Sequence, residues 1–86
     1  MKEKIIIVSN KMGLHARPAA MLVQTTAKYN SMVKILKDDF EVDAKSIMGV
    51  MALAAGHGST LKFVADGPDE SKVLIAIEDL FESMVD

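Results

Sequence analysis

The order of apolar and polar positions along the chain predicts seven elements. A β-branched Ile/Val run at residues 4–8 and alternating segments at 32–37, 40–42 and 61–66 are typical of strands. The two middle strands are joined by a tight Asp38-Asp39 turn, which indicates a hairpin. Helices are predicted at 16–29, at 46–55 closed by Gly56 or Gly58, and at 70–85. The order β-α-β-β-α-β-α favours a two-layer α+β fold with helices on one face of the sheet.

Composition and charge narrow the classes of protein. The chain has 86 residues, 10 Lys+Arg against 12 Asp+Glu, and no Cys. This length predicts a single domain over residues 1–86. The absence of cysteine excludes disulfide scaffolds, thiolate metal sites and thiol catalysis. The net charge is −2 and acidic and basic residues are interspersed, so the sequence shows no basic patch for binding nucleic acid. No apolar run is long enough to span a bilayer. We therefore expect a soluble cytoplasmic domain with no metal and no cofactor.

The segment from Gly13 to Ala19 holds the first candidate site. Pro18 is tolerated only in a first helical turn, so His15 is expected at or just before the N-cap. The unpaired N–H groups and the positive end of the helix favour a neutral, nucleophilic imidazole over the imidazolium. Together with the Arg17 guanidinium, they would hold a phosphate beside the ring. The local pattern alone still favours a plainer interpretation, a surface histidine that caps the helix weakly.

The second candidate is the helix that begins after Ser46. Capping explains this serine on its own, although a phosphate there would also suit the positive helix end. Ile47, Met48 and Met51 lie on a helix that is apolar around almost its whole circumference, so some of these side chains must face water unless tertiary packing hides them. Flexible methionines suit a surface that meets several partners.

The rest of the sequence contains no further catalytic or metal-binding motif. His57 lies between two glycines with no partner at catalytic or metal-ligand spacing. There is no P-loop, carboxylate pair or dinucleotide fingerprint. A small hydrolase using His15 and Arg17 would need a water-activating base and a substrate pocket, and the sequence offers neither. The His15 site therefore predicts a phosphoryl acceptor that is not itself a turnover enzyme.

The two motifs Gly13-Leu14-His15-Ala16-Arg17-Pro18-Ala19 and Lys45-Ser46-Ile47-Met48-Gly49-Val50-Met51 together resemble the HPr family. These are the histidine-containing phosphocarriers of the bacterial phosphoenolpyruvate:sugar phosphotransferase system. The resemblance covers essentially the whole chain. It implies an open-faced β-sandwich in which three helices cover one face of a four-stranded antiparallel sheet.

The resemblance also implies roles for individual residues. His15 would accept a phosphoryl group on Nδ1 from enzyme I and pass it to enzyme IIA domains, while Arg17 neutralises the phosphate. Ser46 would be a regulatory site for HPr kinase/phosphorylase, whose product docks on catabolite control protein A. The shared docking patch for enzyme I and enzymes IIA would consist of Ala16, Ala20, Ile47, Met48 and Met51.

The chain departs from the family pattern at Ala54, where many members have glycine near the active histidine. In having alanine at this position the chain is similar to Crh, a catabolite-repression relative. Crh lacks the phosphorylatable histidine, whereas His15 is present here. An alternative to the carrier is therefore a catabolite-repression module that acts mainly through phosphorylation of Ser46.

Overall fold

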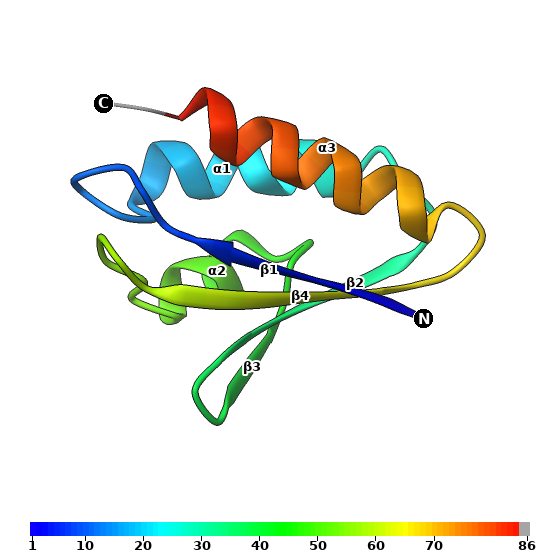
Figure 1. The fold of residues 1–86 in the computed structure, drawn as a ribbon, viewed down its shortest axis with the longest axis horizontal. Coiled ribbons are helices and arrows are strands. Elements are labelled where there is room, and N and C mark those ends of the chain that lie inside the picture. Colours follow the sequence, from blue (N-terminus) through cyan, green and yellow to red (C-terminus); the bar gives the residue numbers. More distant parts are fainter. Residues whose placement is uncertain (85–86) are drawn as a thin grey trace.

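The structure, a computed structural model, describes residues 1–84 and contains one sheet packed against helices. The elements are β1 (Lys2–Ile7), α1 (Ala16–Thr26), β2 (Met32–Lys37), β3 (Phe40–Asp43), α2 (Ile47–Ala52), β4 (Thr60–Asp66) and α3 (Glu70–Ser83). The strands pair antiparallel in the order β1-β4-β2-β3. Helices α1 and α3 lie across one face of this sheet, and α2 contacts α1 and β3 (Figure 1). The predicted fold class and order of elements are confirmed.

The core forms where the inner face of the sheet meets the apolar sides of the helices. In β4, the alternate residues Leu61, Phe63 and Ala65 are buried, as the alternation predicts. Phe63 packs edge-to-face against Phe81 of α3, with ring centroids 5.7 Å apart. Other apolar side chains that are completely buried are Val8, Leu22, Val33, Ile35, Val50, Val73 and Ile77. This packing fixes the start of α1 above the sheet.

Helix α2 is shorter than predicted, because the chain turns out of the helix at Ala54 and not at a glycine. The predicted helix ran to residue 55 and was closed by Gly56 or Gly58, whereas α2 ends at Ala52. The chain turns at Ala54, whose φ of 50° lies in the left-handed region that glycine usually occupies. The Lys37 ammonium donates a hydrogen bond to the Leu53 carbonyl at 3.1 Å and so satisfies one carbonyl at the helix end.

The end of α1 and the start of β1 also differ from the prediction by two or three residues. Helix α1 ends at Thr26 rather than at Tyr29, because the Tyr29 N–H donates to the carbonyl only three residues earlier, at 3.1 Å. Strand β1 begins at Lys2, two residues earlier than predicted, since its first residues pair with β4. Helix α3 is described to Ser83, and the predicted end at Val85 lies outside the described residues.

A carboxylate joins the two loops at the end of the fold remote from His15. Asp69, just before α3, accepts hydrogen bonds from the N–H groups of Asn30 and Ser31, each at 2.9 Å, and from the Ser31 hydroxyl. The Asp69 N–H in turn donates to the Ser31 hydroxyl at 3.1 Å. The Ser31 hydroxyl, followed by the Asn30 N–H, holds the pKa of Asp69 below its usual range. The turn after β4 is thereby tied to the turn after α1.

We expect this tie to make stability depend on pH. A carboxylate with a depressed folded-state pKa stabilises the fold above its unfolded pKa, and this contribution disappears as the pH falls through the folded value. The free energy of unfolding of Asp69→Asn should therefore lie below that of the native chain by a constant amount between about pH 5 and 7. Below about pH 4 the difference should shrink.

Urea unfolding followed by circular dichroism from pH 7 to pH 2 measures this difference. Asp79→Asn, which removes an exposed carboxylate from α3, is the matched control for the loss of one negative charge. A difference between native protein and Asp69→Asn that stays constant down to pH 2 would contradict the assignment.

Candidate functional site

His15 occupies the N-cap of α1, as predicted. Its backbone is extended, with φ −80° and ψ −171°, and its carbonyl accepts the first helical hydrogen bond from Ala19 N–H at 3.0 Å. The N–H groups of Ala16 and Arg17 have no acceptor within the helix, and Pro18 contributes none. No acidic side chain lies in this first turn to neutralise the helix end. The imidazole is therefore next to a region of positive potential.

His15 and Arg17 share an open hollow beside the helix end. Both side chains are exposed, and His15 makes no capping hydrogen bond that would occupy its ring. Among the described residues Arg17 forms no ion pair. The hollow has a volume of about 350 Å³ and is lined by Asn10, His15, Arg17, Pro18, Met21, Ser83 and Met84. A solvent-accessible nucleophile, a guanidinium and helix N–H groups thus lie together, an arrangement suited to a phosphoryl group.

Four residues of this hollow were not predicted from the sequence: Asn10, Met21, Ser83 and Met84. Asn10 is buried, and its side-chain Nδ2 donates to the carbonyl of Gly13, so it braces the loop that carries His15. An Asn three residues before a glycine is typical turn chemistry, and this signal was available in the sequence. Ser83 and Met84 reach the hollow only because α3 ends beside the start of α1, and no local pattern indicates that contact.

The loop before His15 is anchored to the segment that follows α2. The Leu14 N–H donates to the Ala55 carbonyl at 2.8 Å, and this bond fixes the backbone next to His15. Gly13 has φ of 68°, and a Cβ at this position would lie 2.3 Å from the same Ala55 oxygen. Only glycine fits where these two backbone segments approach so closely. The position of His15 is therefore determined by backbone contacts.

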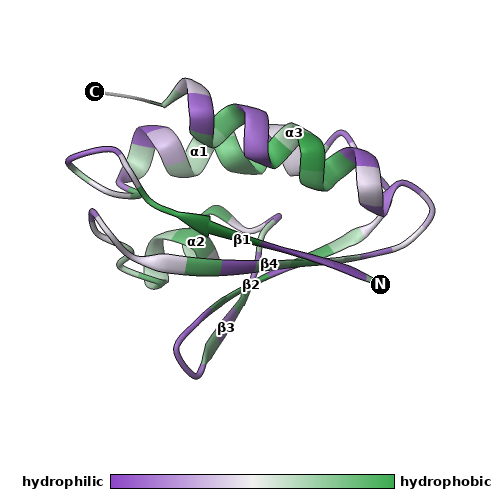
Figure 2. Cartoon of the chain, viewed as in Figure 1, coloured by the Kyte–Doolittle hydropathy of each residue, from purple (hydrophilic) through white to green (hydrophobic). Residues whose placement is uncertain are grey.

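The five residues of the predicted docking patch lie on α1 and α2, which contact each other. Helix α2 is apolar along most of its length (Figure 2). Its Ile47, Met48 and Met51 are 42%, 80% and 45% exposed, and Ala16 is also exposed, whereas Ala20 is half-buried. Tertiary packing therefore does not hide the apolar surface of α2. An uncovered patch of this kind beside a candidate site is typical of a surface that meets partners.

Ser46 is the N-cap of α2, as predicted. Its hydroxyl accepts a hydrogen bond from the Gly49 N–H at 3.1 Å, and its side chain is half-buried. The neighbouring Lys45 reaches back to donate to the Tyr29 carbonyl at 2.7 Å and so holds the end of α1 against the start of α2. Capping accounts for the geometry of Ser46 in this structure.

Loss of this cap has a measurable effect on stability. We expect Ser46→Ala to lower the free energy of unfolding by about 1 kcal/mol, because the Gly49 N–H loses its acceptor. Ser46→Asn, which keeps an acceptor oxygen, should retain most of the native stability. Urea denaturation at neutral pH measures both variants, and equal stability of Ser46→Ala and the native chain would show that the cap contributes nothing.

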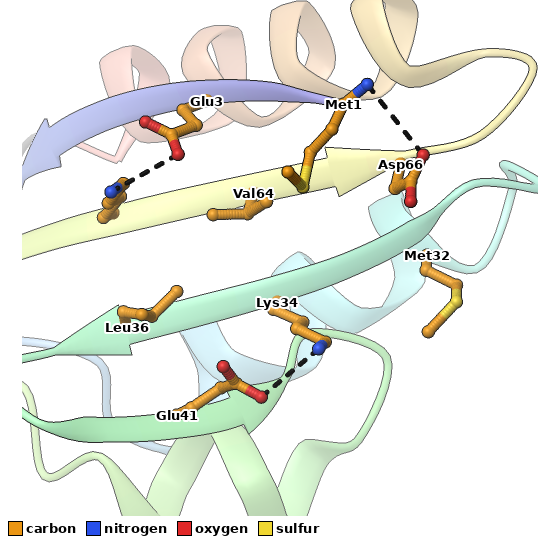
Figure 3. A pocket seen from close by; sticks show the side chains of 9 residues that line it. Met1, Glu3, Met32, Lys34, Leu36, Glu41, Val64 and Asp66 are labelled. Atoms are coloured by element: carbon orange, nitrogen blue, oxygen red, sulfur yellow. Dashed lines mark ion pairs between the residues drawn. The ribbon is translucent and has the colours of Figure 1, made fainter.

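The open face of the sheet contains a second hollow of about 290 Å³, on the side away from α1 and α3. Three ion pairs join residues that line it: Lys62–Glu3 at 3.3 Å, Lys34–Glu41 at 3.4 Å, and the Met1 amino group with Asp66 at 3.9 Å (Figure 3). They surround the apolar Leu36 and Val64. Its charges are thus already paired with each other. Among the described residues no histidine or hydroxyl side chain lines it, so it has no nucleophile of the kind that the His15 hollow contains.

Within residues 1–84 there is no group of three or more His, Asp or Glu side chains arranged to hold a metal ion. In the same part of the chain, none of the helices has the length and apolar character needed to cross a membrane.

Comparison with known proteins identifies the family. Residues 2–83 match the family model described as the PTS HPr component phosphorylation site. The chain belongs to the HPr family. It is 51% identical to the phosphocarrier protein HPr of Treponema pallidum over 83 residues, which cover 96% of this chain and 94% of that protein. It is also 47% identical to the HPr-like protein Crh of Halalkalibacterium halodurans over 77 residues, covering 90% and 92% of the two chains.

Solved structures agree with this assignment. HPr from Thermoanaerobacter tengcongensis is 49% identical and superposes with a TM-score of 0.94, covering 98% of this chain and 94% of that one. The resemblance noted from the two sequence motifs is therefore confirmed. HPr proteins are phosphocarriers of the phosphotransferase system, and Crh relatives connect the family with catabolite repression.

Proposed function

We propose that this HPr-family chain accepts a phosphoryl group on His15 from enzyme I in the cytoplasm and passes it to enzyme IIA domains for sugar import. The observation that carries the proposal is the exposed His15 ring at the start of α1, in the same hollow as Arg17. An exposed imidazole nitrogen is a competent nucleophile toward a phosphoryl group.

The transfer is a displacement at phosphorus. Nδ1 of His15 attacks the phosphoryl group held on a nitrogen of enzyme I, so one N–P bond forms as the other breaks. The Arg17 guanidinium and the first N–H groups of α1 stabilise the charge on the phosphoryl oxygens. Transfer to enzyme IIA repeats the step in the other direction. Since the chain ends each cycle unchanged and makes no product of its own, it is a carrier and not a turnover enzyme.

Docking uses the apolar patch beside His15. Ala16 and Ala20 have short side chains that leave the helix surface open to close approach, and Ile47, Met48 and Met51 supply apolar area. Burial of such a patch drives association without a requirement for fixed charge pairs. One face can therefore serve both enzyme I and several enzymes IIA.

Ser46 carries a proposed regulatory role. HPr kinase/phosphorylase would place a phosphate on its hydroxyl, and the product would dock on catabolite control protein A. The hydroxyl caps α2 next to Ile47 and Met48 in the chain, so a phosphate there would add charge to the docking patch. The N-terminal end of a helix tolerates this charge, so the fold is expected to survive the modification.

The decisive experiment is incubation of the chain with enzyme I, phosphoenolpyruvate and Mg²⁺. We expect one phosphoryl group by intact mass, lost on acid treatment and visible as an N–P species by ³¹P NMR. Absence of transfer from an enzyme I that charges another HPr would overturn the carrier role. The regulatory module would then be the better hypothesis, to be tested with ATP and the kinase for an acid-stable phosphate on Ser46.

A further inference from the structure

The methionines of this chain lie outside the core. Six of the seven are exposed and Met84 is half-buried, so all seven, which lie within the described residues, are absent from the buried set. Methionine is normally among the more buried residues. The exposed six are Met1, Met12, Met21, Met32, Met48 and Met51. Since the chain has no cysteine, the seven methionine thioethers are its only sulfur atoms.

Two of these methionines lie near His15, and two others lie on α2 in the docking patch. Met12 is in the loop that leads to it, and Met21 lines the same hollow. Met48 and Met51 stand three residues apart on α2 and therefore on neighbouring positions of one helix face. Met48 is 80% exposed, more than any other large apolar side chain described. A soluble oxidant thus reaches sulfur atoms in the middle of the docking patch.

We propose that Met48, together with Met51, is a reversible oxidation site at which sulfoxide formation weakens docking of enzyme I. The proposal rests on the carrier function given above and adds a regulation of the same surface. The oxidant class is a peroxide. The thioether sulfur attacks one peroxide oxygen, the O–O bond breaks, and the sulfur is oxidised by two electrons while the second oxygen leaves as water.

The modified side chain differs from methionine in the property that docking uses. A sulfoxide is polar and carries a strong acceptor oxygen, so burying it against an apolar partner leaves that oxygen without water. Methionine sulfoxide reductases reverse the change with a dithiol, which becomes a disulfide as the oxygen leaves in water. The modification is therefore suited to switching, unlike the irreversible higher oxidation of cysteine.

The fold should tolerate the modification. Oxidation of buried methionines disrupts cores, but here six of the seven are exposed and only the half-buried Met84 packs against the core. Helix α2 is held by the buried Val50 and the Ser46 cap. Sulfoxides at Met48 and Met51 therefore change the surface and leave the packing intact. This separates the proposed effect from general oxidative damage.

The test compares phosphoryl transfer before and after treatment with hydrogen peroxide. Peptide mass spectrometry gives the oxidised fraction at each methionine, and circular dichroism follows the fold. We expect Met48 to oxidise well before Met84, and the KM of enzyme I for the fully oxidised chain to rise roughly tenfold, as desolvation of an added polar oxygen predicts. Methionine sulfoxide reductases should restore the original KM.

Two variants localise the effect, each compared with its own untreated sample. In Met48→Leu/Met51→Leu the ratio of oxidised to untreated KM should be close to one. In Met32→Leu, which removes an exposed methionine from the open face of the sheet (Figure 3), the ratio should match the native chain. An unchanged KM with Met48 fully oxidised, an equal rise in the double variant, or unfolding on oxidation would each overturn the proposal. Failure of the untreated chain to accept phosphate would instead overturn the carrier function, and the proposal with it.

Discussion

We expect His15→Ala to abolish acceptance of the phosphoryl group from enzyme I, with the rate falling to roughly a thousandth or less of the native value. The substitution removes the proposed nucleophile, and within residues 1–84 no second histidine lines the hollow that contains Arg17. The side chain is exposed and makes no capping hydrogen bond, so its loss should leave the fold and the free energy of unfolding nearly unchanged. Transfer is measured as acid-labile phosphate, and the fold by circular dichroism.

His57→Ala is the matched control. It removes the other histidine of the chain, an exposed residue between Gly56 and Gly58. We expect this variant to accept phosphate at the native rate. Normal acceptance by His15→Ala, or loss of acceptance in His57→Ala alone, would place the acceptor elsewhere.

Gly13→Ala has the largest expected effect on stability. A Cβ at this position would lie 2.3 Å from the Ala55 oxygen and 2.7 Å from the Gly56 Cα, both backbone atoms. The left-handed φ of 68° adds a further cost for any side chain. Together these effects should lower the free energy of unfolding by about 2–5 kcal/mol. The loop must move away from Ala55, so His15 is displaced and phosphate acceptance falls as well.

Substitutions at two other glycines separate the cost of the left-handed φ from the cost of crowding against Ala55. Gly58 also has a left-handed φ, of 87°, but open space around its Cβ position, so Gly58→Ala should show the conformational cost alone, about 1 kcal/mol. Gly56 has open space and no left-handed φ, so Gly56→Ala should be neutral or slightly stabilising. Urea unfolding of the three variants measures the series. Equal losses for Gly13→Ala and Gly58→Ala would show that crowding against Ala55 contributes nothing.

The elements that local patterns determine could be predicted from the sequence. Alternation predicted the strand at 61–66, in which the apolar Leu61, Phe63 and Ala65 are buried. Pro18 identified the start of α1 and hence the N-cap position of His15. Ser46 followed from the same chemistry of helix starts. These signals need only the residues within one turn or one strand.

Features that depend on contacts between distant segments could not be predicted. The end of α2 was misplaced because Ala54 takes a conformation that alanine seldom adopts, and glycines farther along were the natural choice. The bonds between Asp69 and Ser31 join residues 38 apart, and Asp69 alone is only a plausible helix cap. Ser83 reaches the His15 hollow through the packing of α3, which no local spacing specifies. Asn10 is the exception, since its turn with Gly13 is local.

The way His15 is held has a consequence for speed. Its backbone is fixed by the bond from Leu14 to Ala55, but no capping bond restrains the ring, so its two torsions are free until a partner arrives. Freezing such a side chain costs about 0.5–1.5 kcal/mol of binding free energy on each encounter. Differences in affinity between related complexes appear mostly in the dissociation rate, so this entropy cost shortens the lifetime of each complex. A carrier must leave one enzyme before it can reach the next. A ring that no capping bond restrains lowers the affinity of each complex, so exchange between the enzymes is faster.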